Sequence, residues 1–117
     1  MRILIVEDDA NVRSFLQRAI KALRPKAKVD TANHGADGLK LARRHGYDLI
    51  ITDYHMPRMN GLDLIQSLFQ EGYFLPVVVI SADCSVANES LLAGASYFLA
   101  KPITMEDLNQ MLANFGL

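Results

Sequence analysis

Five short segments of the chain are rich in apolar, β-branched and aromatic residues. Three of them are almost continuously apolar: ILIV at 3–6, LIIT at 49–52 and VVVI at 77–80. YFLA at 97–100 is similar, whereas KVDTA at 28–32 alternates between polar and apolar positions. Continuous runs are typical of parallel strands covered on both faces, and the alternating run is typical of an edge strand. The pattern therefore predicts five strands, with 28–32 at an edge of the sheet.

Apolar stripes with a helical period lie between these segments. They are formed by Val12, Phe15, Leu16, Ala19, Ile20 and Leu23; by Ala36, Leu39 and Ala42; by Leu62, Ile65, Leu68 and Phe69; and by Met105, Leu108, Met111, Leu112 and Phe115. Asp9 or Asn11 is the candidate N-cap of the first helix, and Pro25 should end it. Asn60 and Thr104 are candidate N-caps of the third and last helices.

A weaker periodic pattern over residues 85–92 predicts a shorter fourth helix. Strands and helices thus alternate five times along the chain. Right-handed crossovers between parallel strands place helices on both faces of one sheet. We therefore predict a single α/β domain over residues 1–117, without linker or repeat.

Composition limits the possible classes of function. The chain has 117 residues, of which 50% are hydrophobic and 21% charged, which suits one compact globular domain. A net charge of -1 argues against direct nucleic acid binding. No apolar run is long enough to span a bilayer, and the single cysteine, Cys84, has no partner for an internal disulfide. We expect a cytoplasmic protein with no signal peptide and no membrane contact.

Polar side chains follow four of the five predicted strands. They are Glu7, Asp8 and Asp9 after the first strand, Asp53 after 49–52, Ser81 after 77–80 and Lys101 after 97–100. The carboxyl ends of parallel strands meet at one edge of a sheet, so these groups should converge there. Lysine is rarely buried without a partner, and the acids would supply one for Lys101.

This set of side chains suits phosphoryl transfer onto a carboxylate. Carboxylates held close together repel one another, and a divalent cation relieves the repulsion. A site that offers only oxygen ligands suits Mg²⁺ better than zinc. A carboxylate can act as the nucleophile, while the metal and a lysine neutralise charge on the transferred group. Asp53 is the best candidate because it ends the most central strand, and Ser81 could hydrogen-bond a phosphoryl oxygen.

Four segments of the chain together carry a family resemblance: ILIVEDDANVR, LIITDYHMPRMNGLDL, VVVISA and FLAKP. In this order and at this spacing, they resemble the receiver domains of two-component response regulators, over essentially the whole chain. The resemblance implies a doubly wound (βα)5 flavodoxin-like three-layer sandwich with sheet order 2-1-3-4-5. It also implies a switch that catalyses its own phosphorylation and slow dephosphorylation and is not a turnover enzyme.

The resemblance assigns roles to individual residues. Asp53 is the implied phosphoacceptor, and its phosphoryl group would come from a histidine kinase or a histidine phosphotransfer protein. The implied Mg²⁺ ligands are Glu7, Asp8, Asp53 and the backbone carbonyl of His55. Asp8 would bind the metal more directly and Glu7 through water. Lys101 would pair with the phosphoryl group, and the bond before Pro102 is expected to be cis.

The resemblance also assigns the switch and its output. Ser81 and Phe98 match the switch positions, although many members of the family have a tyrosine where this chain has Phe98. The side chains of His55 and Asp83 match positions that tune phosphoryl lifetime, with a bystander surface histidine as the alternative for His55. The output face would be the fourth helix, the last strand and the last helix. It would contact a downstream protein or a fused effector, and the short fourth helix leaves the common dimer in question.

Two other classes of function remain as alternatives. A receiver-like scaffold would bind partners without being phosphorylated, but the complete set of acids and lysine argues against it. A flavodoxin-like cofactor binder needs a phosphate-binding loop after the first strand. The segment VEDDAN puts three acids there instead, and they would repel a phosphate. The pattern leaves open whether the chain stands alone or is the amino-terminal part of a longer protein.

Overall fold

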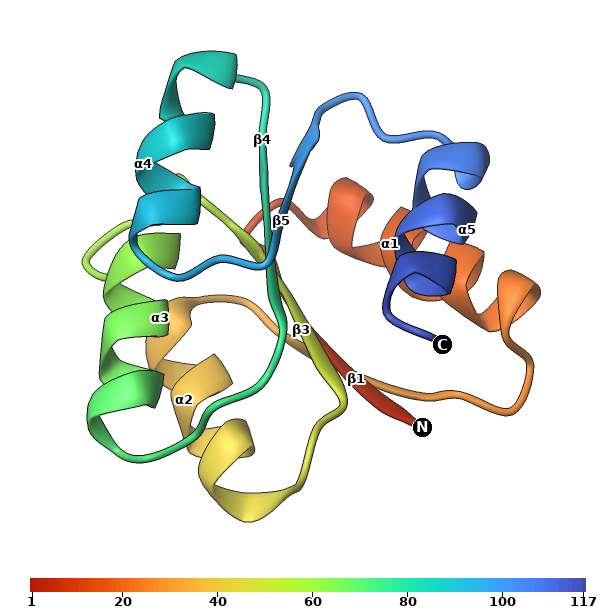
Figure 1. Cartoon of the computed structure of the whole chain (residues 1–117). Helices are drawn as coiled ribbons and strands as arrows, with labels where there is room; N and C mark the ends of the chain where they lie inside the picture. Colours follow the sequence, from red (N-terminus) through yellow and green to blue (C-terminus); the bar gives the residue numbers. More distant parts are fainter.

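Five parallel strands form one sheet in the computed structural model of residues 1–117 (Figure 1). The strands are β1 (Arg2–Val6), β2 (Lys28–Ala32), β3 (Leu49–Asp53), β4 (Val77–Ser81) and β5 (Tyr97–Ala100). Their order in the sheet is β2-β1-β3-β4-β5. The predicted α/β class and sheet order are confirmed. The three most apolar segments became the three inner strands, as expected for strands covered on both faces.

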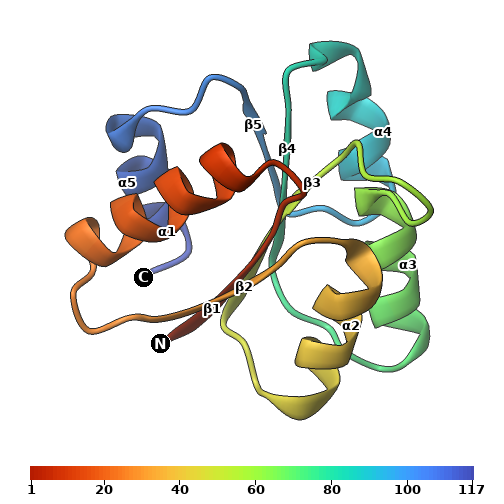
Figure 2. The same cartoon turned by 180° about the vertical axis from the view of Figure 1, so that it is seen from behind.

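Helices cover both faces of the sheet and complete a three-layer arrangement (Figures 1 and 2). They are α1 (Ala10–Leu23), α2 (Gly35–Arg44), α3 (Gly61–Gln70), α4 (Ala87–Leu92) and α5 (Met105–Asn114), with a short 3-10 helix, η1 (Cys84–Val86), before α4. Helices α1 and α5 lie on one side, and α2, α3 and α4 on the other. None of these helices has the length and apolar character needed to cross a membrane.

The continuous apolar runs serve two separate cores. Successive residues of a strand point to opposite faces of the sheet. Ile3 and Ile5 therefore pack with α1 and α5, whereas Leu4 and Val6 pack with α2 and α3. All four side chains are fully buried. A strand between two helical layers thus needs apolar residues at every position.

The predicted helix caps are confirmed, and the structure decides between the two candidates for α1. The carboxylate of Asp9 accepts hydrogen bonds from the amides of Asn11 and Val12, at 2.8 and 3.2 Å. Asn60 and Thr104 form capping boxes at the starts of α3 and α5. Helix α1 ends at Leu23, before the proline at position 25.

The predicted helix over residues 85–92 is divided into η1 and α4. The Asp83 carboxylate accepts a hydrogen bond from the Ser85 amide at 3.0 Å and so caps η1. Helix α4 has six residues and no side-chain cap, and Leu92 on it is 88% exposed. The neighbouring strand β5 is at the edge of the sheet and is only partly buried. This corner is therefore only partly covered.

Close packing of α2 on β1 should make Gly38 intolerant of a side chain. A methyl group at Gly38 would lie 2.7 Å from Cγ2 of Val6. Alanine ordinarily stabilises a helix interior, but the crowding should outweigh that gain and lower the free energy of unfolding by about 1–3 kcal/mol. Urea denaturation of Gly38→Ala measures the effect. Gly46→Ala is the control, since a methyl group there meets no atom within 4 Å. Equal stability of the two variants would contradict the packing.

Candidate functional site

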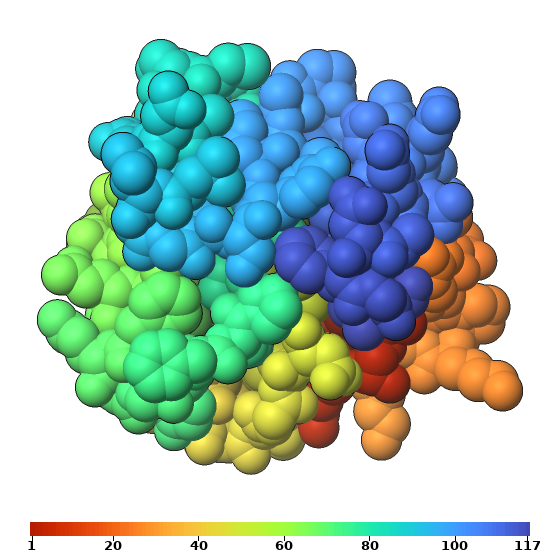
Figure 3. Space-filling model, viewed as in Figure 1, coloured from red at the N-terminus to blue at the C-terminus, as the bar shows by residue number.

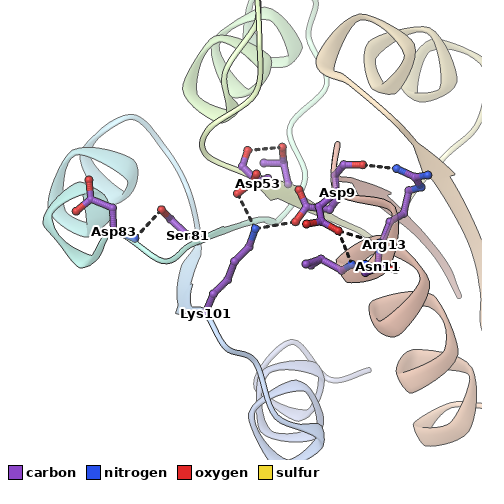
Figure 4. A network of polar contacts seen from close by, with 10 residues as sticks. Asp9, Asn11, Arg13, Asp53, Ser81, Asp83 and Lys101 are labelled. Atoms are coloured by element: carbon purple, nitrogen blue, oxygen red, sulfur yellow. Dashed lines mark hydrogen bonds and ion pairs between the residues drawn. The ribbon is translucent and has the colours of Figure 1, made fainter.

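Four strand ends bring the predicted site residues together at one edge of the sheet (Figure 4). Glu7 follows β1 directly, Asp53 and Ser81 are the last residues of β3 and β4, and Lys101 follows β5. The glutamate is 0% exposed, Asp53 is 5% exposed and Ser81 is 1% exposed. Three polar groups are thus held away from water at the carboxyl edge of the sheet.

Lys101 reaches across this edge and contacts two of the acids. Its Nζ lies 2.7 Å from Oε1 of Glu7 and 3.3 Å from Oδ1 of Asp53. Figure 4 shows the side chain of Lys101 extending toward Asp53 and the start of α1. The Lys101 amide donates to the carbonyl of Ser81 at 2.9 Å, and the bond from Lys101 to Pro102 is cis. A partly buried cation thus has charged partners.

The charges at this edge are not balanced. Burial raises the pKa of Glu7 to about 7, the hydrogen bond from Lys101 opposes the rise, and the charge of Asp53 adds to it. Burial by itself would lower the pKa of Lys101, but the hydrogen bond to Glu7 and the charge of Asp53 outweigh it, so the pKa is raised. One ammonium group therefore faces two buried carboxylates.

The acids also have the arrangement of a site for a divalent cation. Carboxylate oxygens of Glu7, Asp8 and Asp53 all lie within 4.8 Å of one another. Oε2 of Glu7 is buried and has no hydrogen-bond partner. A buried oxygen without a partner is costly, and a cation would satisfy it. Hard oxygen ligands of this kind fit Mg²⁺.

Asp9 does not belong to this cluster, because its carboxylate caps α1. Arg13, on the first turn of that helix, was not predicted to contribute. Its Nη1 donates to the backbone carbonyl of Glu7 at 2.8 Å and helps to fix the strand end (Figure 4). The sequence gives no signal for this contact, because an arginine at this position of a helix usually faces solvent.

Ser81, Asp83 and His55 lie at the rim of the site. The amide of Asp83 donates to Oγ of Ser81 at 3.0 Å. Oδ2 of Asp83 lies 3.9 Å from Nε2 of His55, and these two side chains are 48% and 60% exposed. Hydrogen bonds from Ser85 lower the pKa of Asp83. The two residues predicted to tune phosphoryl lifetime are thus neighbours.

An apolar cavity of about 480 Å³ opens beside Lys101. Its apolar lining comes mainly from α1 and the segment after β5 and includes Val12, Phe15, Pro102 and Ile103. Phe98 lies outside this cavity. It is partly buried on the opposite face of the sheet and packs against the core of α2 and α3.

Comparisons with known proteins find relatives over nearly the whole chain. Residues 3–113 match the family model of the response regulator receiver domain. The chain is 38% identical over 112 residues to the putative two-component response regulator ARR21 of Arabidopsis thaliana and 37% identical over 110 residues to response regulator MprA of Mycobacterium leprae. These matches cover 95% and 92% of this chain but 18% and 47% of those proteins. The chain therefore spans less than half the length of either relative.

The fold is also similar to solved structures. One is response regulator protein TrrA from Thermotoga maritima, solved in complex with Mg(2+)-BeF. The TM-score is 0.87 at 25% sequence identity, and the match covers 97% of each chain.

Burial of Glu7 should make the stability of the metal-free chain depend on pH. The pKa of Glu7 is about 7 in the folded chain, above its ordinary value of 4.5. The folded state therefore binds this proton more tightly than the unfolded state does. Proton binding by Glu7 thus adds to the free energy of unfolding at low pH, and this contribution is lost as the pH rises through the pKa of the folded state. We expect the free energy of unfolding to fall between about pH 5 and pH 8, and Glu7→Gln to flatten this slope.

Chemical denaturation with a chelator present measures these slopes. Glu106→Gln removes an exposed carboxylate outside the site and should keep the wild-type slope. The same slope in Glu7→Gln as in the wild type would show that Glu7 is already ionised throughout this range.

Proposed function

This chain belongs to the family of response regulator receiver domains, and from that premise we propose that it accepts a phosphoryl group on Asp53 and then changes its α4-β5-α5 surface. Phosphoacceptor signalling is typical of this family. The observation that carries the proposal is a nearly buried carboxylate, Asp53, with an ammonium group at 3.3 Å and two further acids within ligand distance. Residues 1–117 would act as one receiver domain.

The chemistry follows from that arrangement. An Asp53 oxygen attacks the phosphorus of a phosphohistidine, the phosphorus–nitrogen bond breaks, and an aspartyl phosphate forms. Glu7, Asp8, Asp53 and the carbonyl of His55 would hold Mg²⁺, which supplies positive charge to the phosphoryl oxygens. Lys101, 3.3 Å from Asp53, brings a further positive charge. The chain would thus catalyse its own phosphorylation and slow dephosphorylation without being a turnover enzyme.

The structure also supports a route from Asp53 to the surface. The Ser81 hydroxyl now accepts a hydrogen bond from the Asp83 amide. We expect it to turn and donate to a phosphoryl oxygen instead, and Phe98 to move inward. The response is a shift between two populated arrangements. His55 and Asp83, at the rim, would tune how quickly water reaches the aspartyl phosphate.

The expected output surface is continuous. Figure 3 shows the segments of α4, β5 and α5 side by side on one face of the molecule. Leu91 and Leu92, which belong to α4, are 48% and 88% exposed. Exposed apolar groups of this kind suit a protein partner. The partner would be a downstream protein or an effector fused to this chain.

The phosphodonor would be a histidine kinase or a histidine phosphotransfer protein in the cytoplasm. The apolar cavity beside Lys101 offers it a docking surface next to Asp53. A net charge of -1 gives no general attraction for nucleic acid, so we expect no direct nucleic acid or membrane binding.

Asp53→Asn should abolish phosphorylation, because the amide is not a nucleophile. Incubation with acetyl phosphate and Mg²⁺ should add one phosphoryl group to the wild type, detected by intact-mass spectrometry. No addition is expected without Mg²⁺ or in the variant. A phosphoryl group retained by Asp53→Asn would place the acceptor elsewhere, and no addition to the wild type under any condition would favour an unphosphorylated scaffold.

Lys101→Ala should leave phosphorylation possible but uncouple it from the surface change. The variant keeps the nucleophile and the acids but loses the cation that pairs with the phosphoryl group. Amide hydrogen exchange over α4 and α5, with and without phosphorylation, measures the response. The exposed Lys40→Ala is the control and should respond like the wild type. A full response in Lys101→Ala would exclude the lysine from the switch.

A further inference from the structure

A hydrogen bond joins the phosphoacceptor strand to α4. Tyr54 follows Asp53 directly, and its hydroxyl donates to Oε1 of Glu89 at 2.5 Å. Glu89 lies in the middle of α4, 35 residues further along the chain. The bond to Glu89 also raises the pKa of Tyr54, as expected when a carboxylate stabilises the neutral phenol. A residue adjacent to Asp53 thus contacts the expected output surface directly.

Tyr54 is the fixed end of this connection. Its amide donates to the carbonyl of Ile80 and its carbonyl accepts from the amide of Gly61, both at 2.9 Å. Its ring meets the ring of His55 edge-on, with centroids 4.6 Å apart, and packs against the core beneath α2 and α3. The hydroxyl is therefore presented to α4 from a backbone held on two sides.

Helix α4 is the weakly held end. It has six residues, no side-chain N-cap and strongly exposed apolar groups. Its other side-chain hydrogen bond, from Ser90 to the carbonyl of Val86, is local. The bond from Tyr54 to Glu89 is the one side-chain hydrogen bond that ties α4 to another element. Losing it would leave the helix held mainly by the packing of a few side chains.

A second connection reaches the start of α4 from Ser81. The Ser81 hydroxyl holds the Asp83 amide at 3.0 Å, and the Asp83 carboxylate caps η1, which leads directly into α4. This connection is broken when the Ser81 hydroxyl turns toward a phosphoryl group. The bond from the Tyr54 hydroxyl to Glu89 includes none of the side chains of Asp53, Ser81 and Lys101. It is therefore not broken directly by phosphorylation, and it opposes any movement of α4 away from Tyr54.

We propose that Tyr54 is a positioning residue that holds α4 in its unphosphorylated position through Glu89 and thereby sets how readily the chain switches. This inference rests on the proposed function of Asp53. A contact made only in the unphosphorylated arrangement stabilises that arrangement. By linkage, the factor by which the contact favours this arrangement is also the factor by which it disfavours phosphorylation.

Affinity for beryllofluoride with Mg²⁺, a mimic of the phosphoryl group, tests the inference. Tyr54→Phe removes only the hydroxyl and should bind beryllofluoride about threefold tighter or more, the factor expected for one modest hydrogen bond. Glu89→Ala should show a similar gain. The double variant should gain no more than either single one, because both changes remove the same bond.

Two control variants separate this effect from general perturbation. Tyr97→Phe removes the hydroxyl of a tyrosine on the other face of the sheet, beside Phe115. Asn88→Ala changes an exposed neighbour of Glu89 on the same helix. Both should bind beryllofluoride as the wild type does.

A purely structural role would lower the stability of Tyr54→Phe to urea and leave its affinity for beryllofluoride unchanged, which would overturn the inference. Weaker binding by Tyr54→Phe, or additive gains in the double variant, would also overturn it. If the wild type itself binds no beryllofluoride, the proposed function fails and the inference falls with it. If the wild type binds beryllofluoride and Tyr54→Phe binds it with the same affinity, the proposed function stands and only this inference is overturned.

Discussion

The central constraint on this structure is a shortage of positive charge at one edge of the sheet. Glu7 and Asp53 are buried, Asp8 lies beside them, and Lys101 supplies the one nearby ammonium group. Buried like charges cost free energy unless they are protonated or paired. A divalent cation and a phosphoryl group each change this balance. This imbalance is the basis of the metal site and of the phosphoryl transfer that we propose.

The fold confines this constraint to one edge of the sheet. Apolar residues at most positions of β1, β3 and β4 bury the sheet between two helical layers, and the polar groups of the site come where those strands end. The helices on the two sides differ in how well they are held. Helices α3 and α5 have capping boxes, whereas α4 has no side-chain cap. A change at the strand ends should therefore appear first in the α4 corner of the molecule.

Periodicity and the geometry of parallel sheets predicted the strands and the convergence of Glu7, Asp53, Ser81 and Lys101. The sheet order was predicted from the family resemblance. The sequence also indicated Asp9 as a candidate cap of α1 and left it out of the implied metal ligands, but Asn11 remained the alternative cap until the structure showed the hydrogen bonds of the Asp9 carboxylate. It missed the bonds from Arg13 to the Glu7 carbonyl and from Tyr54 to Glu89. Those contacts depend on side-chain direction and on the placement of a short helix, which no local pattern encodes.

Calorimetric titration with Mg²⁺ tests the central claim most directly. Wild type, Asp8→Asn and Asp9→Asn should be compared, since each variant loses one of two adjacent charges and asparagine retains the helix cap of Asp9. The account predicts one Mg²⁺ bound by the wild type and by Asp9→Asn, and strongly weakened binding by Asp8→Asn. Equal loss of binding in both variants, or in neither, would contradict a site formed by Glu7, Asp8 and Asp53.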